Sequence, residues 1–373
     1  MPGVNKKLII ISGGGTGGPS ITPLALAAAY RRLDPAAHFL FVGSDPDLEK
    51  LLFGESFRRL GAEYLSLPAG KWRRYFSWKN FRDIFKIVAA FFYSWRLCRR
   101  RRPDLIISAG SFASVPLVWA GHFQGVKILV HQQDIRPGLA NRLMAPAADK
   151  LTVAFAKSLA DYGNRATVIG NPSEADVITE TERLEARQKF GLEPGRPFLF
   201  ITGGGSGALA LNRIFFEALS LLPTDWQIIH QTGRGKEEGA PKKEGYQVFS
   251  SLDHSDFSVL LSLADLVVSR AGLGIFTELA LLAKPALVIP IPHSHQEENA
   301  AFLEENQAAI VLNQEKLDGK KLADGLMSLW QDTARRQELS ARIKKLLPAD
   351  AAARGALIIK ELLNPSAEDS SRL

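Results

Sequence analysis

The chain has 373 residues, of which 46% are hydrophobic and 23% charged, and its formal net charge is +7 at pH 7. This length predicts two domains, and these fractions are typical of proteins that fold. The single cysteine, Cys98, excludes an internal disulfide and a cysteine-built metal site and agrees with a reducing compartment. The sequence contains no run of about 18 uncharged apolar residues, so we expect a cytoplasmic protein whose membrane contact is peripheral.

Short apolar runs alternate with helical patterns through the first half of the chain. The first run follows MPGVNKK and is too short for a signal peptide. Because the runs are apolar throughout, they are typical of parallel strands that helices cover on both faces. They predict an α/β, Rossmann-like domain over residues 1–170. The expected strands are 8–12, 38–42, 104–108, 127–131 and 150–154.

The same rhythm restarts at Pro197 and predicts a second Rossmann-like domain over residues 197–365. Residues 171–196 are polar and charged, so we expect them to hold a helix and the interdomain connection. Residues 366–373 lack apolar content and are expected to form a loose tail. The second set of apolar runs lies in PFLFITGGGSGA, WQIIHQTG, YQVFSS, ADLVVSRAG and PALVIPIP.

Three glycine-containing loops follow expected strands and should each begin a helix. They are GGGTGG at 13–18, GGGSGA at 203–208 and RAGLGIFTE at 270–278. Backbone N–H groups at such loops, with the positive end of a helix dipole, bind phosphate groups. One loop alone is equally well explained as a tight turn, but three of them favour a diphosphate held in a cleft between the two domains. None matches a dinucleotide or P-loop signature.

A basic, aromatic segment lies between residues 71 and 102. Its eleven Lys or Arg residues and one acid give it a net charge of +10, which exceeds that of the whole chain. The apolar residues from Phe81 to Trp95 recur at helical spacing, and a helix packed on its sheet explains them more simply than a membrane contact does. The flanking residues, including the run Arg99 to Arg102, instead predict contact with an anionic membrane surface, although nucleic acid would also accept such a patch. The expected membrane patch comprises Trp72, Arg73, Arg74, Tyr75, Phe76 and Trp78.

Taken together, the motifs resemble the MurG family, the peripheral membrane N-acetylglucosaminyltransferases of peptidoglycan synthesis. The resemblance extends from about Lys7 to Leu363 and favours a sugar-nucleotide enzyme over a nucleic-acid-binding protein. It rests on GGTGG at 14–18, GSFASVP at 110–116, HQQD at 131–134, GLANR at 138–142, GNP at 170–172, GGGSGA at 203–208, HQTG at 230–233, SRAG at 269–272 and PHSHQEENA at 292–300.

The resemblance implies the two-domain GT-B fold, with acceptor and membrane on the first domain and UDP-sugar on the second. The implied reaction moves GlcNAc from UDP-GlcNAc to the muramyl 4-hydroxyl of lipid I, a polyprenyl-diphosphate-linked muramyl peptide. It gives lipid II with inversion of the anomeric centre, in cell-wall biogenesis, cell shape and cell division. No cofactor and no metal are implied, and the enzyme is expected at the cytoplasmic face of the membrane.

The resemblance also implies a set of donor-binding residues. Those of the first loop lie beside the diphosphate, the loop 273–278 wraps the UDP, Glu278 holds ribose hydroxyls, and Gln296 reaches the sugar. The set comprises Thr16, Gly17, Gly18, Asp134, Gly205, Ser206, Leu252, Leu273, Gly274, Ile275, Phe276, Thr277, Glu278 and Gln296.

The chain departs from the family pattern at several chemically important positions. The family's HEQN is HQQD here, so the usual Glu is Gln132 and a carboxylate has moved to Asp134. We therefore expect Asp134, with His131 beside it, to act as the catalytic base or to orient it. His131, like His230, is equally well explained as a strand-end histidine bonded locally. The family's His after GGTGG and its Val-Arg after GNP are replaced here by Pro19 or Ser20, and by Ser173 and Glu174.

These departures leave other functions open. One is a divergent paralogue, such as a glycosyltransferase that adds a hexose to diacylglycerol. Another is a catalytically impaired UDP-sugar binder, which Glu174 favours because an acid near a diphosphate is repulsive unless paired. A sugar-nucleotide epimerase would share the fold but would not need the basic patch. The diacylglycerol glycosyltransferase would share the glycine loops and the basic patch, but HQTG, GLANR and the spacing within HQEENA favour the MurG family.

Overall fold

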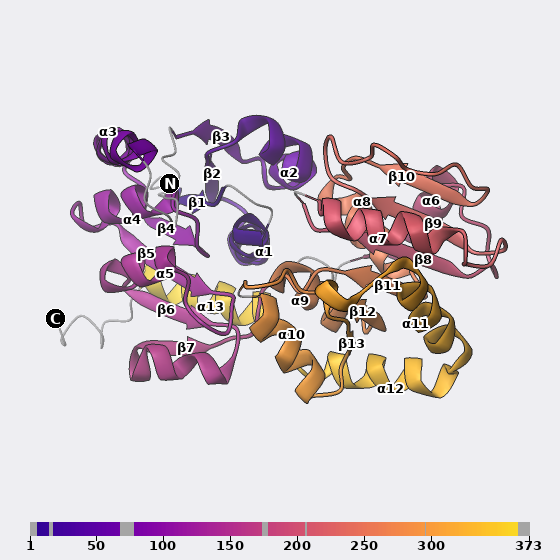
Figure 1. The fold of residues 1–373 in the computed structure, drawn as a ribbon. Helices are drawn as coiled ribbons and strands as arrows, with labels where there is room; N and C mark the ends of the chain where they lie inside the picture. Colours follow the sequence, from indigo (N-terminus) through magenta and orange to yellow (C-terminus); the bar gives the residue numbers. More distant parts are fainter. Residues whose placement is uncertain are drawn as a thin grey trace. The chain divides into compact units, whose positions relative to one another are not determined.

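The computed structural model describes residues 6–14, 18–67, 78–173, 178–205, 207–294 and 296–364 (Figure 1). The chain forms two compact units. The first comprises Met1–Ser173 and Ala349–Leu373, and the second comprises Glu174–Pro348. Each unit is built on one parallel sheet, which confirms the expected α/β class with two Rossmann-like domains.

The first unit contains a seven-stranded sheet in the order β3-β2-β1-β4-β5-β6-β7, and every neighbouring pair is parallel. From β1 the strands are added first on one side, as β2 and β3, and then on the other side, from β4 to β7. Ligands of such sheets bind outside the carboxyl ends of the strands at the point between β1 and β4 where this order reverses. The strands are β1 (Leu8–Ser12), β2 (His38–Gly43), β3 (Glu63–Ser66), β4 (Leu105–Ser108), β5 (Lys127–Gln132), β6 (Lys150–Val153) and β7 (Ala166–Val168).

Helices cover both faces of this sheet, because successive residues of each buried strand point to opposite faces. Ile9 and Ile11 of β1 join one core cluster with the first two helices, whereas Ile10 joins the other cluster with Leu97 and Leu117. The helices are α1 (Gly18–Leu33), α2 (Pro46–Leu60), α3 (Trp78–Arg101), α4 (Ser114–His122), α5 (Leu139–Met144) and α13 (Ala351–Leu363). The short 3₁₀ turns are η1 (Ala145–Ala147), η2 (Ala156–Asp161) and η3 (Gly163–Arg165).

The second unit repeats the design with a six-stranded parallel sheet in the order β10-β9-β8-β11-β12-β13. Its strands are β8 (Phe198–Thr202), β9 (Gln227–Gln231), β10 (Tyr246–Phe249), β11 (Leu266–Ser269), β12 (Ala286–Val288) and β13 (Ile310–Val311). Its helices are α6 (Glu180–Lys189), α7 (Leu209–Leu219), α8 (His254–Leu263), α9 (Leu273–Leu281), α10 (Gln296–Glu305), α11 (Gly319–Gln331) and α12 (Thr333–Lys344), with the 3₁₀ turn η5 (Gln314–Lys316).

Helix α6 lies within the expected connection. The Thr179 side chain accepts from the Glu182 N–H while the Glu182 side chain accepts from the Thr179 N–H, a reciprocal cap that fixes where the helix begins. The helix packs against α8 and belongs to the second unit. The connection therefore holds the expected helix, but that helix is part of a domain.

Helix α13 corrects the expected end of the second domain at residue 365. It packs against α1 of the first unit, where Ile359 is fully buried. A Cβ atom added to Gly355 would lie 2.0 Å from the Leu26 side chain, so the absence of a side chain lets the two helices approach closely. Figure 1 shows this last, yellow helix beside the strands of the first unit.

The buried face of α3 also differs from the expected one. The sequence predicted that the stripe from Phe81 to Trp95 packs on the sheet, but Val88 and Phe92 are 48% and 65% exposed. The buried face instead carries small residues, which let α3 lie close against α4. These are Ala90, Ser94 and Cys98, and Leu97 is buried beside Cys98.

Candidate active site

The first glycine loop follows β1 at the point where the sheet order reverses. The structure describes it as far as Gly14 and again from Gly18, where α1 begins, so the predicted residues Thr16 and Gly17 lie outside the described residues. Gly14 has φ 139°, a conformation that favours glycine. A Cβ atom added to Gly13 would lie 2.4 Å from the Ser20 hydroxyl oxygen. The loop therefore fits tightly against the first turn of α1.

A buried carboxylate, Glu49 of α2, lies beside this loop and holds the end of the neighbouring strand β2. Its Oε1 accepts from the backbone N–H groups of Ser44 and Asp45 at 3.1 and 3.3 Å, and its Oε2 accepts from the Tyr64 hydroxyl at 2.7 Å. Burial, followed by this hydrogen bond, raises the pKa of Tyr64. A Cβ atom on Gly43 would lie 1.7 Å from Glu49 Oε2, so only glycine fits there.

Sequence reasoning missed Glu49. Its only signal is an acid in the first turn of an expected helix, which normally indicates a favourable interaction with the helix dipole. Only the three-dimensional structure shows that this carboxylate is 3% exposed and lies beside the first glycine loop. Glu49 therefore positions the backbone that ends β2.

His131, the predicted partner of Asp134, is fully buried at the end of β5. Asn171 Oδ1 lies 3.2 Å from its Nε2 and also accepts from the Thr22 hydroxyl, so Nε2 carries the proton. Nδ1 then accepts from the Thr152 hydroxyl at 2.9 Å. Burial lowers the pKa of His131 to about 4. Because both ring nitrogens are occupied, these contacts favour a positioning role that ties α1 to the end of the sheet over a role as base.

His230 of β9 has the same kind of environment in the second unit. Its Nδ1 lies 2.9 Å from the Tyr246 hydroxyl and its Nε2 lies 3.1 Å from Asn212 Oδ1. Burial lowers its pKa to about 3. Both histidines thus lie at strand ends, with both ring nitrogens bonded to residues of their own unit.

The low pKa of His131 predicts that the free energy of unfolding depends on pH. Its folded-state pKa lies below its ordinary 6.5, so it favours the folded state above about pH 6.5 and that contribution is lost as pH falls toward 4. We expect the wild type to lose about 2 kcal/mol of unfolding free energy through this residue between about pH 7.5 and about pH 5. Urea denaturation at the two pH values should show a smaller loss in His131→Gln, whereas exposed His122→Gln should behave as the wild type.

Gln132, the departure noted in the HQQD motif, bonds to the loop after β5. The side chain is 1% exposed, and its Nε2 donates to the backbone carbonyls of Asp134 and Ile135 at 3.0 and 3.4 Å. A carboxylate in this place would face two carbonyl oxygens and would have to be protonated. The amide therefore holds the loop after β5, and the half-buried Asp134 lies in that loop.

The second glycine loop follows β8 in the second unit. The Thr202 hydroxyl accepts from the Gly204 N–H at 3.0 Å, and Lys236 Nζ donates to the Gly207 carbonyl at 3.0 Å. A Cβ atom on Gly207 would lie 2.1 Å from the Thr232 carbonyl oxygen, so the HQTG segment packs directly on the loop. Predicted Gly205 lies in this loop, and Ser206 lies outside the described residues. Lys236, which the sequence reasoning missed, brings a positive charge to the loop.

The third loop leads into α9, whose first residues are the predicted Leu273 and Gly274. Glu278 is 1% exposed on the same helix, and its carboxylate accepts from the Ser258 hydroxyl at 3.3 Å and lies 3.9 Å from His254 Nδ1. The residues between Gly274 and Glu278 are also buried; they are Ile275, Phe276 and Thr277. This loop therefore presents the N–H groups of a helix N-terminus at the carboxyl end of β11.

Two more predicted donor residues lie at the same edge of the second sheet. Leu252 follows β10 and is buried, and Gln296 begins α10. Gln296 Nε2 would lie 3.9 Å from a Cβ atom on Gly272, so it is adjacent to the third loop. The structure thus brings the described donor residues of the second unit to one edge, while Asp134 belongs to the first unit.

Arg270 holds the neighbouring turn. Its guanidinium, 5% exposed, donates to the carbonyls of Ile289 and Pro290 at 3.1 and 3.3 Å, and burial lowers its pKa to about 10. Within the described ranges, no group of three or more His, Cys, Asp or Glu side chains could hold a metal ion. In the same ranges, no helix has the length and apolar character needed to cross a membrane.

Comparison with known proteins places both units in one family. Residues 9–153 match the family model of the glycosyltransferase family 28 N-terminal domain, and residues 198–354 match that of the C-terminal domain. A Clostridium botulinum (strain Loch Maree) protein named UDP-N-acetylglucosamine–N-acetylmuramyl-(pentapeptide) pyrophosphoryl-undecaprenol N-acetylglucosamine transferase is 33% identical, over 87% of this chain and 92% of its own. A Geobacillus kaustophilus protein of the same name is 31% identical, over 89% of this chain and 93% of its own.

Solved structures share the fold. The crystal structure of Acinetobacter baumannii MurG is 22% identical, with a TM-score of 0.66 over 95% of this chain and 99% of its own. UDP-GlcNAc 2-epimerase from Neisseria meningitidis, bound to UDP-GlcNAc, is 12% identical, with a TM-score of 0.71 over 96% of this chain and 99% of its own. At these identities the likeness concerns the fold alone.

Proposed function

Because this chain belongs to glycosyltransferase family 28, we propose that it transfers GlcNAc from UDP-GlcNAc to the muramyl 4-hydroxyl of lipid I and so forms lipid II of peptidoglycan. The observation that carries this proposal is sequence identity of 33% across both domains with a transferase of that name. The glycine loops at the carboxyl ends of both sheets agree with it, because the donor carries a diphosphate.

The donor belongs on the second unit. The N-terminus of α9 and Lys236 supply positive charge for the diphosphate, and buried Glu278 accepts hydrogen bonds from ribose hydroxyls. As the bond between the anomeric carbon and the phosphate oxygen breaks, UDP leaves with the electron pair. The same N–H groups stabilise the charge that develops on UDP.

The acceptor belongs on the first unit, where Asp134 takes the proton of the muramyl 4-hydroxyl. The freed oxygen attacks the anomeric carbon from the side opposite UDP, which inverts that centre in one displacement. Gln132 orients the loop through the backbone carbonyl of Asp134, so the loop does not depend on the carboxylate to hold its shape. His131 and Glu49 fix the ends of the neighbouring strands.

The first unit is also the part that meets the membrane. The expected patch residues 72–76 lie outside the described residues, and α3 begins at Trp78. The described part of α3 and the end of α4 expose Phe92 and Phe123 at 65% and 61%. Phe91 lies between them, with ring centroids 5.7 and 6.3 Å away. Exposed Arg96, Arg99 and Arg100 on α3 supply the charge that attracts anionic lipid.

Substitutions at this exposed aromatic surface should weaken membrane binding and leave the transfer reaction unchanged. We expect Phe92→Ser combined with Phe123→Ser to weaken binding to phosphatidylglycerol vesicles by about tenfold or more, because each buried phenyl ring contributes about 1.5–3 kcal/mol. Vesicle co-sedimentation measures this effect. Turnover of a water-soluble, short-chain lipid I analogue should stay unchanged, and Leu184→Ser, at a 55% exposed leucine of the second unit, should bind vesicles as the wild type does.

Transfer of labelled GlcNAc to short-chain lipid I tests the proposed function directly. Product should form from UDP-GlcNAc and much less from UDP-glucose, and the rates with and without EDTA would reveal any need for a metal. UDP-GlcNAc binding without product would instead indicate a different acceptor, such as diacylglycerol, or an impaired enzyme. Absence of both binding and product would contradict the proposal.

A further inference from the structure

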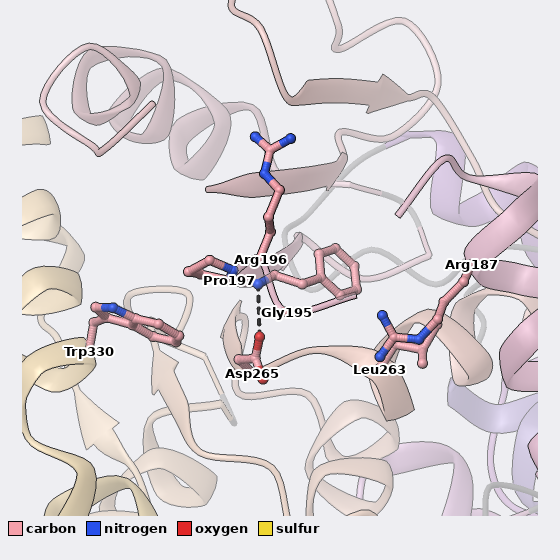
Figure 2. Close-up of a pocket in the computed structure, with 8 residues that line it drawn as sticks. Arg187, Gly195, Arg196, Pro197, Leu263, Asp265 and Trp330 are labelled. Carbon is pink, nitrogen blue, oxygen red and sulfur yellow. Dashed lines mark hydrogen bonds between the residues drawn. The ribbon is translucent and has the colours of Figure 1, made fainter. Parts of the chain in front are cut away.

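The second unit has a pocket at the edge of its sheet opposite the glycine loops (Figure 2). It opens where β8 and β11 begin, since Phe198 is the first residue of β8 and Asp265 precedes β11. The pocket has a volume of about 210 Å³, which is smaller than the roughly 300–1,000 Å³ of pockets for drug-sized ligands. Its lining comprises Arg187, Gly195, Arg196, Pro197, Phe198, Leu263, Asp265 and Trp330.

The pocket carries positive charge that lacks a carboxylate partner. Arg187 is half-buried, and its guanidinium makes no hydrogen bond or ion pair with any residue that the structure describes. Lys284 donates to the carbonyl of Ala264, the residue before Asp265, at 2.9 Å. Its pKa is lowered to about 8, first by burial and further by the charges of Arg183 and Arg187, against the opposing effect of Asp265.

Other pocket residues are fixed by contacts of their own. Arg196 donates to the Asp225 carbonyl and pairs with Glu193, and its guanidinium extends away from the pocket in Figure 2. Asp265 Oδ2 accepts from the Phe198 N–H at 2.8 Å. The Arg187 guanidinium and Asp265 Oδ1 are therefore the polar groups that remain for a ligand.

Trp330 forms the apolar wall. Its ring lies 5.3 Å from that of Trp226, and the Arg336 guanidinium lies 4.7 Å from its centroid. The Arg336 guanidinium donates to the Leu329 carbonyl and the Thr333 hydroxyl and pairs with no carboxylate among the described residues, so it adds further positive charge. Figure 2 shows Trp330 and Arg187 on opposite sides of Asp265.

We propose that this pocket binds a small hydroxylated organic phosphate of the size of a hexose phosphate. The Arg187 fork matches the phosphate oxygens, a sugar hydroxyl donates to Asp265 Oδ1, and the apolar face of the sugar packs on Trp330. The carboxylate of Asp265 disfavours a bare anion, because the ligand must bring a donor to it. The site lies at the far ends of the same strands that carry the donor loops, so it is distinct from the donor site within this unit.

Isothermal titration of the full chain with glucose 6-phosphate, in the presence of saturating UDP, tests this site. We expect saturable binding of glucose 6-phosphate and none of glucose. Arg187→Gln should weaken the binding about tenfold, and Arg187→Lys, which keeps the charge but loses the fork, should weaken it less. Arg213→Gln, at an exposed arginine of α7, should bind as the wild type does.

Several outcomes would overturn the proposal. They are no saturable binding of glucose 6-phosphate, equal binding of glucose, unchanged affinity in folded Arg187→Gln, and binding of glucose 6-phosphate that appears only when UDP is omitted. The last would place the phosphate at the donor loops. Circular dichroism of each variant establishes that it is folded. Saturating UDP separates this test from that of the proposed transferase activity, because transfer requires the donor loops and this pocket does not.

Discussion

Asp134→Asn is expected to lower the turnover number of GlcNAc transfer by about 10²–10⁴-fold, the usual contribution of a general base. Asparagine has nearly the shape of aspartate but cannot take the proton of the acceptor hydroxyl. The loop should keep its conformation, because Gln132 bonds to the backbone carbonyl of residue 134 and not to its side chain. Steady-state kinetics with short-chain lipid I measure the effect, and calorimetry should show nearly unchanged UDP affinity.

The control for this experiment is Asp47→Asn, which removes an exposed carboxylate from α2 of the same unit. It should leave turnover unchanged. Near-normal turnover of Asp134→Asn would remove Asp134 from the role of base. His131 would not replace it, since both of its ring nitrogens are bonded inside the protein.

Much of the fold follows from local patterns in the sequence. Apolar runs of uniform character predicted parallel strands, and the glycine loops predicted the turns at the carboxyl ends of three of these strands. These features are local, because a strand buried on both faces and a helix N-terminus each leave a mark within a few residues. The strands β3, β7 and β13 were missed because they are short and only partly buried.

The places where the prediction was wrong involve partners far away in the chain. The sequence placed the end of the second domain at residue 365, because nothing within α13 indicates which of two similar sheets it covers. The close fit of Gly355 against Leu26 is visible only in the folded structure. For α3, the large apolar residues suggested one buried face. The structure uses the small residues Ala90 and Ser94 instead, because close approach to α4 matters more than side-chain size.

In the candidate site, too, some features follow from the local sequence and others depend on residues far away in the chain. The sequence left two interpretations of His131 open, and the contacts that favour one of them come from Thr152 and from Asn171, which is 40 residues away. Gln132 was marked as a departure from the family pattern, yet its bonds to two backbone carbonyls show a change that the loop accommodates. A substitution at a catalytic motif therefore has to be weighed against the backbone groups that it contacts.

Glu278→Gln is expected to raise the KM for UDP-GlcNAc by about 10–100-fold with a much smaller change in turnover number, because a hydrogen bond to a charged group contributes about 1.5–3 kcal/mol. Glu278 is buried on α9. Glutamine keeps the shape of this side chain but lacks the charged carboxylate that accepts hydrogen bonds from the ribose hydroxyls. Calorimetric UDP affinity gives the same comparison without turnover. Glu244→Gln, at an exposed residue of the same unit, is the matched control.

The sharper version of this experiment compares UDP with 2′-deoxy-UDP and 3′-deoxy-UDP in both proteins. If Glu278 binds the ribose, removal of a hydroxyl that donates to it should weaken binding of the nucleotide to the wild type. The same removal should hardly affect binding to Glu278→Gln, because that variant has already lost the carboxylate. Equal losses for both proteins would mean that the ribose hydroxyls are bound elsewhere. Glu278 would then act through the Ser258 and His254 contacts by holding α9 in place. The two outcomes separate a ligand contact from a structural one within the same buried carboxylate.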